Sequence, residues 1–213
     1  TGLAMERGTQ TGTVYQQQFP GQPVDLEILG NSPIVLMTNG MVWPESAQQG
    51  ESMVIEDALD LEPLGNGEGY LVMDRLGNVY AFGTAVDQGD AIFEKTIVFG
   101  RYEVQTRVPL AIDLEVVADP ANPSINQAAY VLGTNGEIQE LGANVANLPD
   151  VPQDFGPVVA FELDVNAGAV TGYTVMNYLG QIMTWDGVAF SAPDNARRTE
   201  TEPYVVDFAF GQG

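Results

Sequence analysis

Apolar residues alternate with polar ones in short runs along the chain, and turns that contain glycine separate the runs. A period of two is typical of β-strands, whereas an amphipathic helix repeats its apolar positions every three to four residues. One plan recurs, in which an alternating strand, a Leu-Gly or Asn-Gly turn and a second strand follow one another. Asn-Gly between such runs is a strong hairpin signal, because both central residues of a type I′ turn need positive φ. The pattern predicts five hairpins, in residues 32–46, 69–83, 128–142, 172–187 and, more weakly, 1–18.

A second signature, a short strand with an acidic residue, precedes four of the hairpins and recurs near the end of the chain. It covers residues 23–29, 58–64, 111–117, 160–166 and 204–210. We place one carboxylate of each strand at a shared register, and these are Asp25, Asp60, Asp113, Glu162 and Asp207. Their intervals of 35, 53, 49 and 45 residues are too uneven for a solenoid of rigid coils. They fit propeller blades whose outer loops differ in length.

The two ends of the chain complete one repeat. Residues 207–213, joined to the first eight residues of the chain, resemble the unbroken stretch 60–77. We therefore expect an all-β fold, a five-bladed β-propeller of four-stranded antiparallel blades that is closed by pairing the C-terminal strand with the N-terminal strands. A β-sandwich would also show alternating strands, but it gives no reason for five copies of a two-part signature. The single domain is expected to span 1–213, with one blade shared between 1–22 and 204–213.

These motifs resemble those of the small repeat propellers, and in blade number and size the chain is similar to the tachylectin-type five-bladed lectins. The D-[LF]-[EA] strand and the GY-x-V-M…LG hairpin carry the resemblance along the whole chain. They specify a blade and not a ligand, so the resemblance implies a scaffold without naming what it binds. Tryptophan–aspartate repeats are a second comparison, but their Gly-His element needs a histidine that the chain lacks.

Composition and charge exclude several classes of function. The 213 residues include 29 acidic and seven basic ones, which gives a net charge of −22. Such a chain repels phosphate backbones and anionic lipids, so we do not expect it to bind nucleic acid or an anionic membrane surface. No span of about 20 apolar residues occurs in the sequence, so we expect no membrane insertion either. The absence of cysteine and histidine removes disulfides, thiol and imidazole catalysis, and the common zinc, haem and copper sites. A single lysine and a pI near 4.1 favour an extracellular or cell-surface location over an acidic cytosolic protein.

The repeated carboxylates are the first candidate site. Quasi-symmetry places Asp25, Asp60, Asp113, Glu162 and Asp207 around a central channel or in the seams between blades. They could hold Ca²⁺, the only cofactor that we consider, because hard cations take several carboxylate oxygens. Alternatively, each could accept backbone N–H hydrogen bonds that lock one blade to the next. The second interpretation is favoured, because a position found in every repeat normally serves the repeat.

The stretch 88–110 departs most from the repeat, and it is the second candidate site. It predicts an outer hairpin with a turn at Gly100 and carries three of the seven cations. On an acidic molecule this clustering indicates a contact element that docks on an acidic face, for example of a neighbouring copy. The alternative is a strand pair that only covers a blade edge. The proposed contact residues are Lys95, Phe99, Arg101, Tyr102 and Arg107.

Aromatic residues and carboxylates leave two further alternatives open. Trp43 and Trp185 lie near turns and are the best candidates for exposed rings that stack on a sugar, whereas most of the other aromatic residues on or next to the five hairpins are expected in the core. A carboxylate-only glycoside hydrolase would need two acids at a defined separation, and nothing in the repeat singles out such a pair.

The sequence as a whole favours a non-enzymatic extracellular or cell-surface propeller that binds another protein, or copies of itself, in a larger assembly. A carbohydrate-binding propeller and a carboxylate-only hydrolase are the alternatives. Assembly predicts a mass that rises with concentration, a lectin predicts that the monomer binds sugars, and a hydrolase predicts turnover that one Asp or Glu replacement abolishes.

Overall fold

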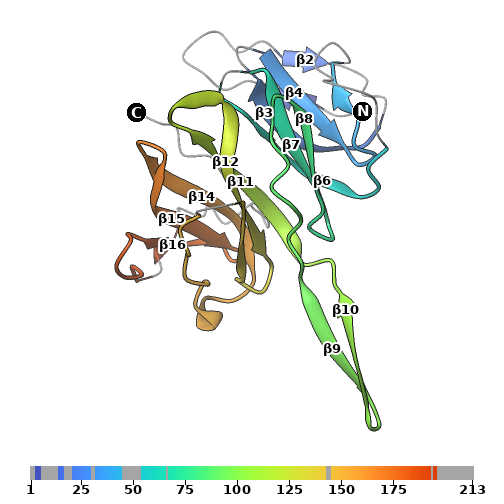
Figure 1. Ribbon diagram of the computed structural model, residues 1–213, viewed down its shortest axis with the longest axis vertical. Coiled ribbons are helices and arrows are strands. Elements are labelled where there is room, and N and C mark those ends of the chain that lie inside the picture. The colour runs from blue at the N-terminus through green and yellow to red at the C-terminus, as the bar shows by residue number, and fades with distance from the viewer. Residues whose placement is uncertain are drawn as a thin grey trace.

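The structure is a computed structural model, and it describes residues 3–5, 14–16, 21–29, 32–44, 54–65, 67–142, 145–192 and 194–195. The fold of this part is all-β, as the sequence predicts, and its one short helix is the 3₁₀ turn η2 (Gln153–Phe155). None of the helices in the described ranges is long and apolar enough to cross a membrane. Figure 1 shows small antiparallel sheets that follow one another, and a hairpin that projects away from them.

Four sheets share one plan, and each is named here by its first strand. The β3 blade contains β3 (Pro23–Leu29), β4 (Ser32–Met37) and β5 (Val42–Trp43), and the β6 blade contains β6 (Ala58–Pro63), β7 (Gly69–Asp74) and β8 (Val79–Gly83). The β11 blade contains β11 (Ala111–Asp119), β12 (Asn122–Gly133) and β13 (Ile138–Leu141). The β14 blade contains β14 (Val158–Asn166), β15 (Ala169–Asn177), β16 (Gln181–Trp185) and β17 (Asp194–Asn195). Two further hairpins are β1 (Leu3–Met5) with β2 (Val14–Gln16), and β9 (Glu94–Phe99) with β10 (Tyr102–Arg107).

All five predicted hairpins are confirmed by antiparallel pairing. Among the described turns, the one at Asn39-Gly40 differs from the expected type I′ form. There Gly40 has a φ of +79°, whereas Asn39 is not among the residues with positive φ. The N–H of Gly40 donates to the Met37 carbonyl, and the N–H of Met37 donates to the Met41 carbonyl. This is the three-residue loop in which one glycine in the left-handed region follows a type I turn, so only one positive φ is needed.

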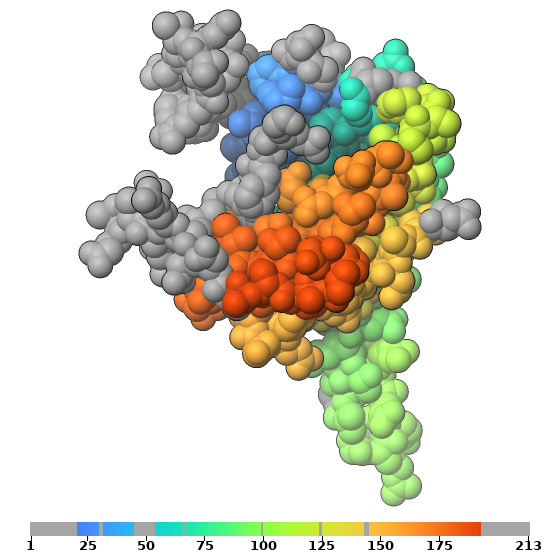
Figure 2. Space-filling model, turned by 90° about the vertical axis from the view of Figure 1, so that its left-hand side faces the viewer, coloured from blue at the N-terminus to red at the C-terminus, as the bar shows by residue number. Residues whose placement is uncertain are grey.

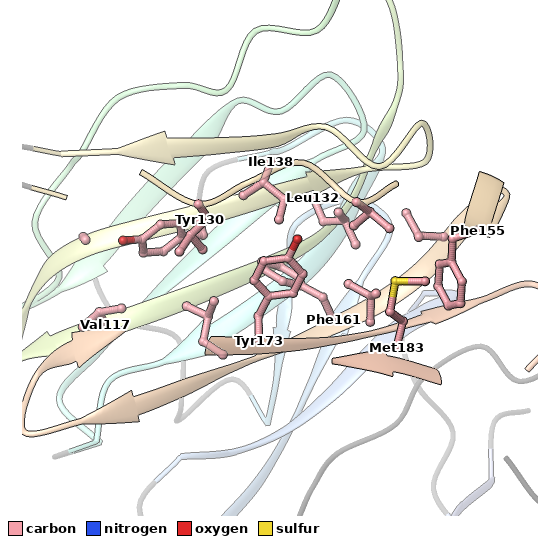
Figure 3. Packing of buried hydrophobic residues seen from close by; sticks show 14 residues of the cluster. Val117, Tyr130, Leu132, Ile138, Phe155, Phe161, Tyr173 and Met183 are labelled. Carbon is pink, nitrogen blue, oxygen red and sulfur yellow. The ribbon is translucent and has the colours of Figure 1, made fainter. Parts of the chain in front are cut away.

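Adjacent blades pack face to face, and the alternation along each central strand explains how. In β7, Tyr70 and Val72 join a cluster with residues of the β3 blade, whereas Leu71 and Met73 join a cluster with residues of the β11 blade. Figure 3 shows the next seam, where Tyr130 and other residues of the β11 blade face the β14 blade. Each inner blade is therefore covered on both faces, as in a β-propeller.

The expectation of four strands per blade is wrong for the β6 and β11 blades. In both, an extended segment follows the third strand without a ladder of its own. Side chains take the place of that ladder: Asp90 accepts the Val79 N–H at 3.0 Å, and Asp150 accepts the Ile138 N–H at 3.0 Å. Within the described ranges only the β14 blade has four strands.

The outer segment of the β6 blade is instead tied sideways to the β11 blade. The side-chain oxygen of Asn126 accepts the Val86 N–H at 2.6 Å, and its NH₂ group donates to the Val86 carbonyl at 2.9 Å. Gln139 makes the same two hydrogen bonds with the N–H and carbonyl of Ile92, at 2.7 Å each. Each side-chain amide therefore makes the pair of hydrogen bonds that the backbone of a neighbouring strand would otherwise make. The proposed closing strand, 204–210, and most of the shared blade lie outside the described residues.

Candidate functional site

The first candidate site is the hairpin of β9 and β10, called the arm from here on (residues 94–107). Its register runs from Tyr102 opposite Phe99 to Arg107 opposite Glu94, and Gly100, with a φ of +64°, lies in the turn. The prediction of an outer hairpin that turns at Gly100 is therefore confirmed. Figures 1 and 2 show that the arm projects from the blades. No other described strand pairs with either of its edges.

The arm has an apolar face. Residues that are directly paired in an antiparallel ladder point to the same side, and neighbours along a strand point to opposite sides. One side, called the apolar face, carries Ile97 opposite Val104, with Tyr102 toward the tip and Lys95 opposite Thr106 toward the root. Ile97, Val104 and Tyr102 are 38%, 50% and 72% exposed. The other side is polar except for Val98, which is 61% exposed.

Arg107 holds the root of the arm against the β6 blade. Its guanidinium donates to Asn78 Oδ1 at 2.8 Å, to the Ala91 carbonyl at 2.9 Å and to the Leu76 carbonyl at 3.3 Å. The sequence suggested Arg107 as a contact residue, but the structure shows this side chain engaged within its own chain. Lys95 is exposed on β9, and Arg101 is exposed in the turn.

The arm also differs from the rest of the chain in charge. It holds three of the seven basic residues and two of the 29 acidic ones, which leaves it at +1 and the rest of the chain at −23. The clustering of cations that the sequence indicated thus lies on a structurally separate element. Phe99 has its backbone in the ladder opposite Tyr102.

The second candidate site is a cavity of about 330 Å³ that the first strands of the four blades line, called the channel from here on. Quasi-symmetry predicted such a channel. No basic residue is among the described residues of its wall. Seven carboxylates are, namely Asp25, Glu27, Asp60, Glu62, Asp113, Glu115 and Glu162.

Aspartates of the channel lock each blade to the next, as the favoured interpretation of the sequence proposed. Asp25 Oδ2 accepts the Leu61 N–H at 3.0 Å, and Asp60 Oδ2 accepts the Leu114 N–H at 2.6 Å. Asp113 Oδ2 accepts the Phe161 N–H at 2.6 Å. Each bond joins the first strand of one blade to that of the following blade. Because a buried N–H needs a hydrogen-bond acceptor, these contacts hold the spacing of the strands around the channel.

The placement of Glu162 at the register of these aspartates is wrong. The backbone N–H groups of Leu61, Leu114 and Phe161 each donate to the aspartate of the preceding blade, so these three residues are equivalent. The residue before Phe161 is therefore the counterpart of Asp60 and Asp113, which precede Leu61 and Leu114. That residue is Ala160, and the bulge at this position of β14 matches those in the other blades. Glu162 is instead the counterpart of a second ring of carboxylates, Glu27, Glu62 and Glu115. The sequence signature misled because FELD places an acid two residues later than DLE.

The channel perturbs its own carboxyl groups. Burial raises the pKa of Asp60 well above the usual range for aspartate, and the negative charges of Asp113 and Asp25 raise it further. Burial likewise raises the pKa of Glu62, and Glu115 and Asp60 add the largest repulsions. The physical cause is the same in both cases, since a low-dielectric wall and like charges both favour the protonated form.

The Ca²⁺ site stays a prediction. Within the described ranges no group of three or more acidic residues is arranged to hold a metal ion. Three of the five proposed ligands, Asp25, Asp60 and Asp113, accept hydrogen bonds from the next blade, and Asp207 lies outside the described residues.

The tryptophans proposed for sugar stacking are not exposed platforms. Both Trp43 and Trp185 are half-buried. Trp185 packs on Tyr173 with ring centroids 5.6 Å apart, at the edge of the core between the β11 and β14 blades. The expectation that these two rings are exposed is therefore wrong, because neighbouring strands cover positions that the turns seemed to leave open.

No family model matches the chain, and neither does any of the curated proteins searched. Among solved structures, it is similar to the β-propeller domain of Cps50 (Swd1) from Myceliophteria thermophila, with 10% identity and a TM-score of 0.42. The alignment covers 96% of this chain and 72% of that one. The description of this chain as blades around a channel rests on its own packing, and the class that its fold defines is an all-β protein with propeller-type blades.

Proposed function

We propose that this chain is a non-enzymatic β-propeller of the cell surface or extracellular space that joins a larger protein assembly through its arm. The observation that carries the proposal is the exposed apolar face of the arm, with Ile97, Tyr102 and Val104 in contact with solvent. The acidic composition supports the location, and the channel supports a structural role for the repeated aspartates.

An arm of this kind needs a partner. A two-stranded hairpin is marginally stable by itself, and an apolar face exposed on a projecting element marks an interaction site. Arg107 and the blades fix the root of the arm, so the face is presented in one orientation. A rigid element with an apolar centre and basic residues at its tip and root suits a protein surface better than a small ligand.

The proposal includes five blades and a closed ring. Hairpin β1–β2 supports the fifth blade, and the D-F-A motif around Asp207 repeats the D-L-E motif of Asp25 and Asp60. In a closed ring Asp207 would accept a backbone N–H of β3, as Asp25 accepts one from β6. Closure would also give β1 a second strand to pair with and would cover the outward faces of the first and last blades.

The test removes the arm without disturbing its root. Because Glu94 and Arg107 are directly paired, residues 95–106 can be replaced by an Asn-Gly turn that joins the two. In cells that produce the protein, the full chain should elute in a complex larger than its own 22.8 kDa, and the armless variant should elute as the free chain. Val188→Ser, at an exposed apolar residue far along the sequence, is the matched control. An armless variant that stays in the large complex would overturn the proposal.

The alternatives remain untested predictions, with one measurement each. A lectin would bind glycans as a monomer, and Trp43→Ala should then reduce binding. A hydrolase would use Glu62, whose raised pKa suits a proton donor, and Glu62→Gln should then abolish turnover. Bound Ca²⁺ would raise the melting temperature, and EDTA would lower it again.

A further inference from the structure

We infer that the arm pairs two copies of this chain, with the apolar faces of the two arms stacked antiparallel about a twofold axis. The inference rests on the proposed function, and it names the partner of the same surface as a second copy of the chain. In this dimer the tip of each arm lies at the root of the other.

The face is self-complementary along its length. Its centre is the pair Ile97 and Val104, with Tyr102 toward the tip and Lys95 with Thr106 toward the root. An antiparallel stack places the centre of one arm on the centre of the other, and this covers Ile97 and Val104 in both. The same stack brings Lys95 of one arm close to the tip of the other, where the partner's Tyr102 offers a ring for a cation–π contact. The apolar and the polar ends of the face are thus both matched.

Charge favours a dimer that holds the two acidic bodies apart. Each arm has a net charge of +1 and the rest of each chain −23, so the repulsion between two bodies is far larger than that between two arms. A strand of six residues is about 20 Å long, whereas screening at physiological salt acts over about 8 Å. The antiparallel stack therefore keeps the two bodies apart by more than the screening length. It also brings each Arg101 to the acidic body of the other copy.

The expected dimer is weak, because the contact is one hairpin long and two strands wide. Interfaces below about 1,200 Å² are typical of transient complexes. Sedimentation of the purified full chain should give a monomer at low micromolar concentration, and twice the monomer mass of 22.8 kDa should appear toward millimolar concentration. A chain that stays monomeric up to that concentration overturns the inference. It leaves the proposed function intact if the armless variant still leaves the large complex in cells.

Two substitutions on opposite faces separate this dimer from unspecific association. Val104→Asp buries a charge at the centre of the stack and should weaken dimerisation at least tenfold. Val98→Asp introduces the same charge at a more exposed valine on the polar face, and dimerisation should not change. Equal loss in both variants would overturn the stacked arrangement in favour of pairing through the strand edges.

Cross-linking decides the direction, and the chain suits it because it has no cysteine of its own. Stacked sheets lie about 10 Å apart, which a short bis-maleimide spans. In the antiparallel stack Thr106 of one arm lies over the partner's Tyr102, so Thr106→Cys mixed with Tyr102→Cys should cross-link in the heterodimer. Val104→Cys should cross-link alone, and Val98→Cys should not. If Tyr102→Cys links to itself and fails to link to Thr106→Cys, the arms are parallel and the inference is wrong.

Discussion

In strand β7 and in the strands of the arm, side chains alternate between two faces, yet β7 is buried and the arm is largely exposed. Every residue of β7 is buried, because the β3 blade covers one face and the β11 blade covers the other. In the arm the residues around the turn are exposed on both faces. The comparison shows that period-two alternation defines the two faces of a strand, whereas the neighbours in space decide which of them is buried.

The largest expected effect is the difference in the free energy of unfolding between a truncated core side chain and a truncated side chain of the arm. Phe161→Ala removes a buried ring from the seam between the β11 and β14 blades, and it should lower the free energy of unfolding by about 3–5 kcal/mol. Tyr102→Ala, on the exposed face of the arm, should change it by no more than about 0.5 kcal/mol. Urea unfolding of both variants measures the difference. Similar losses would mean that the arm is covered within the monomer.

The next effect concerns the contacts between blades. Asp60→Asn keeps an oxygen that can accept the Leu114 N–H, whereas Asp60→Ala leaves that group without its acceptor. The Asn variant should be more stable than the Ala variant by about 1–3 kcal/mol, the cost of an unsatisfied buried donor. Chemical denaturation at one pH checks the order. An Ala variant as stable as the Asn variant would show that the N–H finds water in the channel.

The pH dependence follows from the raised pKa values of Asp60 and Glu62. Between the usual carboxyl pKa of about 4 and the raised value, the folded state binds more protons than the unfolded state. Stability should therefore fall as the pH rises through this window, the reverse of ordinary acid denaturation. Glu62→Gln should reduce the slope of a plot of melting temperature against pH. A melting temperature that rises through the same window would contradict the repulsion in the channel.

The last expected effect is at the root of the arm. Arg107→Ala removes three hydrogen bonds to the β6 blade but no core contact, so the free energy of unfolding should fall by about 1–2 kcal/mol. Amide exchange should also become faster in β9 and β10, because they can open locally. Lys95→Ala is the control on the same element. Unchanged exchange in the Arg107 variant would show that the arm is held by other contacts.

Much of the local structure could be predicted from the sequence, and the failures have particular causes. The five hairpins, the outer hairpin at Gly100 and the buried Tyr70, Tyr130 and Tyr173 follow from alternation and turn residues, which act over a few positions. The prediction for Glu162 was wrong because the first acid of FELD stands two residues later than the first acid of DLE. A shift of two residues keeps a side chain on the same face of a strand, so alternation alone does not reveal it. The prediction of a fourth strand was wrong for the β6 and β11 blades. There the carboxylates of Asp90 and Asp150 accept N–H groups of the third strand that a fourth strand would otherwise pair.

The sequence by itself determined the strands, the turns and a charge far from zero, because these depend on residue type and short spacing. Only the tertiary structure decided that seven carboxylates share one channel and that Arg107 donates hydrogen bonds within its own chain. It also decided that the apolar face of the arm is exposed to solvent. The channel, for example, depends on segments that come together across 36 to 54 residues, as in the bonds from Asp25 to Leu61 and from Asp60 to Leu114. Long-range packing, rather than local propensity, sets which polar groups are shared and which apolar ones remain to be covered.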